Sequence, residues 1–367
     1  MAESDQNLRE LLQRAIRAGS APAAVAAWGR AGGEVSGEVV GYSTLFPERA
    51  EVSGETWFDL ASLTKPLVTT TLTLLAFRSG VMTATTRVGE VLDEVRGTEV
   101  GNLDVNQLLT HTAGLPAWLP LYCLAEGRLD LLPSRLGEVR LEGRPGEQVV
   151  YSCVGFVTLG LMLARIADQD LDSLFQCEVL KVLGLEGELG FKVDLATHSL
   201  IGGAAEPAAE MGLIRDLGFD QRWIPATGHG LPDDGNARFL GGKAGNAGLF
   251  GTARGVVALA SEYLPGGGSL LSPGEAAEAT TLQTEGLEQG RSWGWQLGST
   301  PGCSSGQALS EGAFGHTGFT GVSVWCDPQT KSVYVLLTNR NHPTQRGNDL
   351  HPLRRRFHAL AGESLRL

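Results

Sequence analysis

Apolar residues recur along this chain in patterns that predict strands at both ends and helices in between. Near the N-terminus, leucines at helical spacing predict an amphipathic helix that ends at Gly19. The runs 23–29 and 34–42 are strand-like and are joined through Gly32 and Gly33, which indicates a hairpin. Further strand-like runs lie near the C-terminus, at 292–297, 321–326 and 332–338, and a closing helix is predicted at 350–361.

The middle of the chain has a different pattern, with helical spacing and many loops. Helices are predicted at 104–110, 154–166, 171–183 and 253–264, and an irregular, proline-broken span at 202–235. Because the strand-like runs cluster at the two ends, antiparallel pairing is favoured. We therefore expect an α/β fold of the α+β type, an antiparallel β-sheet flanked by helices. Residues 1–80 and 245–367 would form the sheet subdomain, 81–244 a mainly helical inserted subdomain, and the active site would lie between them.

Composition and charge exclude several classes of function. The chain has 29 Lys and Arg against 41 Asp and Glu, and its net charge of −12 disfavours binding to a phosphate backbone. No apolar run is long enough to span a bilayer, and the acidic start of the chain is unlike a secretory signal. We therefore expect neither a nucleic-acid nor a membrane partner, while the oligomeric state is not predicted.

The cysteines and histidines give no sign of a metal site. The five cysteines are widely spaced and include no C-x-x-C pair, which is typical of free thiols in a reducing cytoplasm. No His or Cys pair has the spacing of zinc ligands. A cytoplasmic protein without a metal or an organic cofactor is the expectation.

The segment Ser62-Leu63-Thr64-Lys65 precedes an apolar run and is the only Ser-x-x-Lys in the chain. If 63–79 is a helix with Ser62 as its N-cap, Ser62 and Lys65 face the same way, because residues three apart are neighbours on a helix. An amine beside a hydroxyl is a base beside a nucleophile. Burial and the helix N-terminus are expected to lower the pKa of Lys65. Alone, the pattern is more typical of a capping serine, because short motifs often match by chance.

Three further stretches could complete a site. The tripeptide Tyr-Ser-Cys at 151–153 follows a Pro-Gly turn and precedes a buried helix, and His-Thr-Gly at 316–318 stands at the edge of a predicted strand. The third stretch, 108–116, contains His111, which is expected to brace its loop with a hydrogen bond. Taken singly, a tyrosine or a histidine in such a setting is usually structural. The order of these stretches along the chain is the feature that indicates a catalytic site.

That order resembles the serine β-lactamase and penicillin-binding-protein superfamily, whose signatures are Ser-x-x-Lys, Tyr-x-Asn and Lys/His-Thr-Gly. The resemblance extends over 57–340 and is to the class C β-lactamase-like branch, which includes esterases and D-amino-acid peptidases. It implies that Ser62 forms an acyl-enzyme and that Lys65, Tyr151 and His316 share the catalytic proton transfers. Tyr151 needs a neighbouring cation to release its proton near neutrality, and Lys65 and His316 are the candidates.

The resemblance also implies where a substrate would bind. The backbone N–H groups of Ser62 and Phe319 would form the oxyanion hole, and Cys153, Thr317 and Gly318 would contact the substrate. Two site positions, 153 and 316, depart from the signatures of the family. Cys153 replaces an asparagine that in the family helps to bind the substrate amide, and a cysteine is a poor donor and acceptor. His316 replaces the lysine of β-lactamases and is common in esterase-like members.

These departures favour an ester substrate. We therefore expect a serine hydrolase that acts on small acyl esters. Two alternatives stay open: an amide hydrolase, namely a D-amino-acid peptidase or a weak β-lactamase, and a non-catalytic recognition protein that retains the fold. A competing motif, Gly-Cys-Ser-Ser-Gly at 302–306, matches the nucleophile elbow of α/β-hydrolases, but no helix of sufficient length follows it. We predict that Ser304 lies in a loop outside the site.

Overall fold

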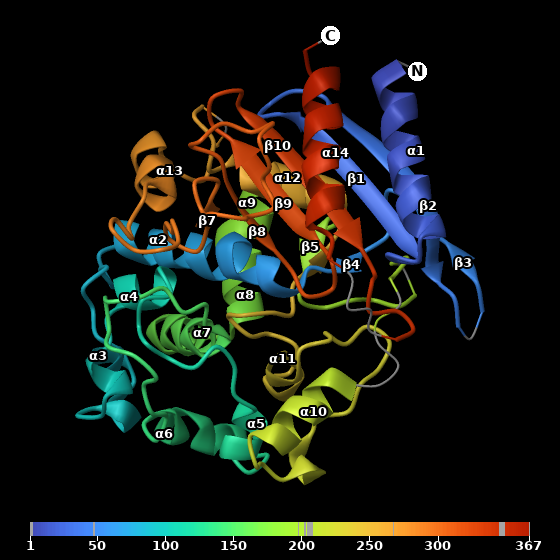
Figure 1. Cartoon of the computed structure of the whole chain (residues 1–367). Helices are drawn as coiled ribbons and strands as arrows, with labels where there is room; N and C mark the ends of the chain where they lie inside the picture. The colour runs from blue at the N-terminus through green and yellow to red at the C-terminus, as the bar shows by residue number, and fades with distance from the viewer. Residues whose placement is uncertain are drawn as a thin grey trace.

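The computed structural model describes residues 3–46, 48–196, 198–201, 203, 208–266, 268–344 and 349–366. Its centre is an antiparallel sheet with the strand order β3-β2-β1-β10-β9-β8-β7, so strands from the two chain ends lie side by side (Figure 1). The strands are β1 (Ala23–Arg30), β2 (Val35–Thr44), β3 (Ala50–Glu51), β7 (Gln296–Leu297), β8 (Phe314–Thr317), β9 (Ser323–Asp327) and β10 (Ser332–Thr338). The expected antiparallel sheet flanked by helices is confirmed.

Both faces of the large sheet are covered, which explains why its central strands are almost continuously apolar. Helices α1 (Glu3–Arg17) and α14 (His351–Ser364) cover one face, where Trp28 of β1 packs edge-on against Phe357 of α14. Helix α12 (Ala253–Ser261) packs against β1, β9 and β10 on the other face. Strand β1 alternates between these two cores, so its buried residues point both ways.

A small second sheet joins the strand-rich and helical regions. It contains β4 (Phe58–Asp59), β6 (Phe250–Gly251) and β5 (Leu189–Gly190), with β6 in the centre. The remaining helices are α2 (Thr71–Arg78), α3 (Val88–Val91), α4 (Val105–Leu109), α5 (Leu121–Leu124), α6 (Leu132–Leu136), α7 (Cys153–Ala167), α8 (Leu171–Phe175), α9 (Lys181–Leu183), α10 (Ala208–Asp216), α11 (Gly235–Phe239) and α13 (Pro273–Thr280). The buried α7 runs through the helical region and packs against α3, α4 and α8.

Some sequence-based boundaries are wrong. The span 202–235 is not irregular throughout, because α10 forms within it; residues 202 and 204–207 lie outside the described residues. The strand predicted at 292–297 is reduced to β7, since Gly294 adopts a left-handed φ of 73° in a turn before it. None of the described helices is long and apolar enough to cross a membrane. The division into two subdomains stays a prediction.

Candidate active site

The proposed nucleophile lies in a tight turn directly after β4. Residues Ala61–Leu63 form a 3₁₀ turn, and a π-helical segment, Lys65–Thr70, connects this turn to α2. Ala61 has a φ of 46°, an unfavourable value for a residue with a side chain. Its N–H donates to the Asp59 carboxylate over 2.8 Å, which holds this conformation. Ser62 is therefore part of a strained turn, and the prediction of an N-cap at Ser62 is wrong.

Lys65 is fully buried beside that serine. Its ammonium donates to Ser62 Oγ over 3.0 Å, to the Asn246 carbonyl over 3.0 Å, and to Cys153 Sγ over 3.5 Å. Burial alone would lower the pKa of Lys65, but the attraction of the Cys153 sulfur and the Tyr151 oxygen outweighs it and raises the pKa. The expected lowering is thus wrong in direction. At neutral pH this amine is charged.

Tyr151 approaches the same amine from the start of α7. Lys65 Nζ lies 5.0 Å from the centre of the Tyr151 ring. Burial raises the pKa of Tyr151, while the charge of Lys65 and hydrogen bonds with Lys65 and Ser62 act in the opposite direction. The next residue, Ser152, caps α7 by accepting from the Gly155 N–H over 3.2 Å. Helix capping therefore fixes where the tyrosine points.

His111 braces the Tyr151 segment from behind. Its Nδ1 accepts from the Ser152 N–H over 3.0 Å, its carbonyl accepts from the Val150 N–H, and its ring lies 4.6 Å from the Tyr151 ring. Burial lowers the pKa of His111 well below its ordinary value, so the imidazole is neutral. The predicted loop hydrogen bond is present. Its contact with Tyr151 has no signal in the sequence.

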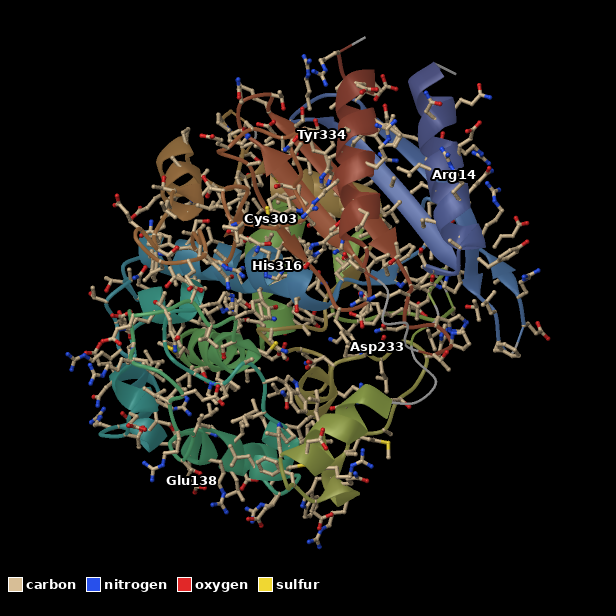
Figure 2. The ribbon with its side chains drawn as sticks, in the orientation of Figure 1. Arg14, Glu138, Asp233, Cys303, His316 and Tyr334 are labelled. Atoms are coloured by element: carbon tan, nitrogen blue, oxygen red, sulfur yellow. The ribbon has the colours of Figure 1, made fainter. Side chains whose placement is uncertain are left out.

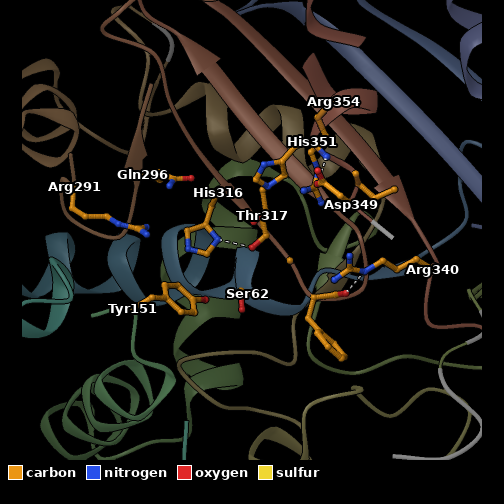
Figure 3. A pocket seen from close by; sticks show the side chains of 13 residues that line it. Ser62, Tyr151, Arg291, Gln296, His316, Thr317, Arg340, Asp349, His351 and Arg354 are labelled. Carbon is orange, nitrogen blue, oxygen red and sulfur yellow. Dashed lines mark hydrogen bonds between the residues drawn. The ribbon is translucent and has the colours of Figure 1, made fainter. Parts of the chain in front are cut away.

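Strand β8 brings the His-Thr-Gly tripeptide against the serine. The ring of His316 lies 5.7 Å from that of Tyr151, and His316 Nδ1 is 2.8 Å from the Thr317 carbonyl oxygen (Figure 3). Burial, with smaller contributions from nearby cations, lowers the pKa of His316 well below its ordinary value. His316 is neutral and cannot supply the positive charge expected of it. Figure 2 shows His316 where the sheet meets the helical region.

Gly318 allows β8 to pass close to the nucleophile turn. A Cβ at this position would lie 2.5 Å from a methyl group of Val322 and 3.0 Å from the Leu60 carbonyl oxygen. Only glycine fits there without a shift of the backbone or of Val322. Phe319 follows and is 45% exposed, at the mouth of the site. Ser62 and Phe319 line the same two cavities, and an oxyanion hole made by their N–H groups stays a prediction.

Two cavities meet at Ser62 and Tyr151. One, of about 410 Å³, is lined by His316, Thr317 and Gly318 and by three arginines, Arg291, Arg340 and Arg354 (Figure 3). The other, of about 270 Å³, is bounded mainly by apolar or weakly polar groups, namely Ala61, Trp118, Cys153, Leu213, Ala247 and Phe319. Carboxylates also line it, but Glu210 is paired with Arg238 and Asp234 caps α11. The nucleophile thus stands between a cationic and a largely apolar compartment.

Sequence reasoning missed Arg291, which lines the cationic cavity with only 6% of its surface exposed.

The prediction that Ser304 lies in a loop is confirmed. The Ser304 hydroxyl is buried and accepts from Trp325 Nε1 over 3.0 Å, and Trp325 belongs to the same core as Trp28 and Phe357. Ser304 does not line the cavity that holds Ser62.

Known proteins share this architecture. A solved structure described as "EstCE1, a hydrolase with promiscuous acyltransferase activity" matches with a TM-score of 0.74 at 22% identity, over 97% of this chain and 98% of that chain. A class C β-lactamase structure matches with a TM-score of 0.73 at 18% identity, over 99% of this chain and 96% of that one. At these identities the likeness shows the fold.

Similarity in sequence points the same way. The Escherichia coli (strain K12) protein named "Putative D-alanyl-D-alanine carboxypeptidase" is 26% identical over 329 residues, which cover 82% of this chain and 73% of that protein. The Beta-lactamase family description matches residues 6–359, nearly the whole chain. With its sheet, its Ser-x-x-Lys turn and this match, the chain belongs to the Beta-lactamase family of serine hydrolases.

Proposed function

We propose that this enzyme is a carboxylesterase that hydrolyses small acyl esters through an acyl-enzyme on Ser62. The observation that carries the proposal is the contact of Ser62 Oγ with Lys65 Nζ, 3.0 Å, within a cleft that also holds Tyr151. A hydroxyl hydrogen-bonded to a titratable pair in a pocket is the arrangement of an activated nucleophile. No metal or organic cofactor is needed for this chemistry.

The reaction would proceed in two halves. Ser62 Oγ attacks the acyl carbon and its proton passes to the Lys65–Tyr151 pair, while the N–H groups of Ser62 and Phe319 hold the oxyanion. Tyr151 then returns a proton to the departing alkoxide, which leaves as an alcohol. In the second half, the same pair takes a proton from water as the water attacks the acyl carbon. The bond to Ser62 Oγ then breaks, the acid is released, and the pair returns the proton to Ser62 Oγ.

The protonation of the pair sets the pH dependence. Both pKa values are raised, so at neutral pH Lys65 and Tyr151 both carry their protons. One proton must leave the pair before it can accept another from Ser62, and the two groups titrate together. We therefore expect kcat/KM for a neutral ester to rise with pH from neutral into the alkaline range.

Cys153 supports an ester rather than an amide as the substrate. Its side chain lines the apolar cavity next to Ser62, and burial raises the pKa of its thiol, so it stays uncharged. A thiol is a weak donor and a weak acceptor, so it would hold the N–H or carbonyl of an amide poorly. An ester with an apolar acyl group does not need a hydrogen-bonding side chain at this position.

The decisive experiment combines labelling with a comparison of substrates. A fluorophosphonate should label Ser62, as located by peptide mass spectrometry, and Ser62→Ala should lower ester turnover by about 10³-fold or more. Ser304→Ala is the matched control and should keep full activity. Labelling of another residue would contradict the mechanism. Turnover of p-nitrophenyl acetate should exceed that of nitrocefin and of a D-alanyl anilide, and the reverse order would reject the esterase.

A peptidase is the second candidate. The arginines that line the cavity beside Thr317 could hold the carboxylate of a short peptide, and the E. coli relative carries a carboxypeptidase name. Release of D-alanine from a D-alanyl-D-alanine peptide faster than hydrolysis of a matched ester would establish this function instead.

A further inference from the structure

Among the residues that the structure describes, Arg291 is a buried cation without a counter-ion. The residue is 6% exposed and lines the cavity that contains Ser62, and among the described residues no carboxylate lies within ion-pair distance of it. One guanidinium nitrogen donates to Gln289 Oε1 over 3.1 Å, and Nε has no hydrogen-bond partner. Burying an unpaired charge is costly, so a structural role alone gives no reason for its presence.

The guanidinium instead faces an aromatic ring. Its central carbon lies 5.8 Å from the centre of the Tyr151 ring, within the range of a cation–π contact (Figure 3). The backbone of Arg291 is fixed, because its N–H donates to Thr284 Oγ1 over 2.8 Å and its carbonyl accepts from the Gln283 N–H over 2.8 Å. A pinned backbone and a buried side chain place this charge reproducibly beside the tyrosine.

Apart from Lys65, the other described groups that contact Tyr151 carry no positive charge. His111 and His316 contact its ring but are neutral, and Cys153 carries a thiol whose pKa is raised. Lys65 is the second cation near the ring, and its ammonium is divided among Ser62, Asn246 and Cys153. With a neutral imidazole at 316, Lys65 and Arg291 are the two cations that contact the ring within the described part of the chain.

We propose that Arg291 is a positioning residue that electrostatically stabilises the Tyr151 phenolate and so makes the Lys65–Tyr151 pair an effective base. The proposal deepens the hydrolase mechanism and rests on it. Burial lowers the pKa of Arg291, and the charge of Tyr151 acts in the opposite direction. A phenolate and a guanidinium stabilise each other by the same free energy, so this attraction also favours the ionised form of Tyr151. Removing the cation leaves the tyrosine with Lys65 alone.

The test uses Arg291→Gln and Arg291→Lys, with Arg356→Gln as an exposed control for the loss of one charge. In Arg291→Gln, the acid limb of kcat/KM for neutral p-nitrophenyl acetate should move upward by about one pH unit, the order expected for a partly screened interaction between a phenolate and a nearby cation. Arg291→Lys retains the positive charge and should keep the acid limb close to its wild-type position. Arg356→Gln should not move the limb. In a Tyr151→Phe background, Arg291→Gln should have no further effect on the limb.

A second readout does not depend on turnover. The ionisation of Tyr151 can be followed by ultraviolet spectroscopy, as the difference between the spectra of the full chain and of its Tyr151→Phe variant. Arg291→Gln should raise the pKa of Tyr151 by the same amount as it moves the acid limb. A lack of esterase activity with this spectral shift intact would reject the proposed function alone. An unshifted phenolate would overturn the role of Arg291. An effect limited to a higher KM for carboxylate-bearing esters would also overturn this role, because Arg291 would then be a substrate-binding group.

Discussion

Cys153 is the side chain on which the proposed preference for esters depends. It lies at the start of α7, where the helix cap fixes its direction, and its sulfur is 3.5 Å from Lys65 Nζ. A buried thiol offers little to a polar substrate group, whereas an asparagine there would offer both a donor and an acceptor. The proposed esterase function therefore makes the residue at 153 the position to test.

The Cys153→Asn variant should therefore shift preference towards amides. We expect the ratio of nitrocefin to p-nitrophenyl acetate turnover to rise by about fivefold to tenfold, which corresponds to one added hydrogen bond of about 1 kcal/mol. Cys177→Asn is the control, because Cys177 is exposed. An unchanged ratio would show that the residue at 153 does not select the substrate.

The positions of the site residues could be predicted, but their charges could not. Ser62, Lys65, Tyr151 and His316 were located by motifs and their order along the chain. The protonation of Lys65 and His316 depends on burial and on neighbours from distant segments, which no local pattern encodes. Arg291 stands alone in its stretch, so nothing in the sequence marks it.

At the scale of elements, the nucleophile turn is held by contacts that come from far along the chain. Asp59 fixes the Ala61 N–H, and it also accepts from the Asp233 N–H over 2.8 Å. Burial and nearby Asp233 raise the pKa of Asp59 to about 7. The predicted single helix over 63–79 fails here, since threonine hydroxyls bond to carbonyls one turn back and the first turns are 3₁₀ and π-helical. Sequence periodicity marks the helix but not this distortion.

The approach of β8 to this turn gives a test of the element geometry. In Gly318→Ala, the added methyl group would collide with Val322 and the Leu60 carbonyl. We expect a loss of about 1–3 kcal/mol in the free energy of unfolding, and a fall in kcat/KM of about tenfold or more because the oxyanion donors move. Denaturant unfolding and ester kinetics measure the two effects.

Gly312→Ala is the matched control for that variant. Gly312 lies just before β8, and a Cβ there would meet Pro328 at 3.5 Å, an ordinary contact distance. It should leave both stability and kcat/KM near their original values. If Gly318→Ala also kept full activity, the close approach of β8 would not matter for catalysis.

For the whole molecule, the meeting of the chain ends is the organising feature. Strand β1 lies between β2 and β10, with Ala26 opposite Leu336, and helices α1 and α14 pack together outside the sheet. The two termini emerge close to each other (Figure 1). The hairpin near the N-terminus could be predicted from two strand-like runs joined through Gly32 and Gly33. A sheet shared by the two chain ends could be predicted as well, but the pairing of β1 with β10 could not, because it joins segments some three hundred residues apart.

Circular permutation tests this arrangement. A chain whose ends are joined by a short flexible linker, with new ends between Glu186 and Gly187 in an exposed turn, should fold and keep ester turnover. Deletion of 332–367 should abolish folding, because β1 then loses its partner β10. Both are checked by circular dichroism and fluorophosphonate labelling. A folded, labelled deletion variant would contradict the importance of the end-to-end pairing.

The same pairing has a consequence for biosynthesis. On the ribosome, β1 is made first and β10 almost last, about 300 residues later. At about 5–20 residues per second, this interval lasts roughly 15–60 seconds. Throughout it, β1 exposes an unpaired apolar edge, the kind of surface that chaperones bind and that promotes aggregation. The nascent enzyme is therefore expected to depend on chaperones until its final strand is released.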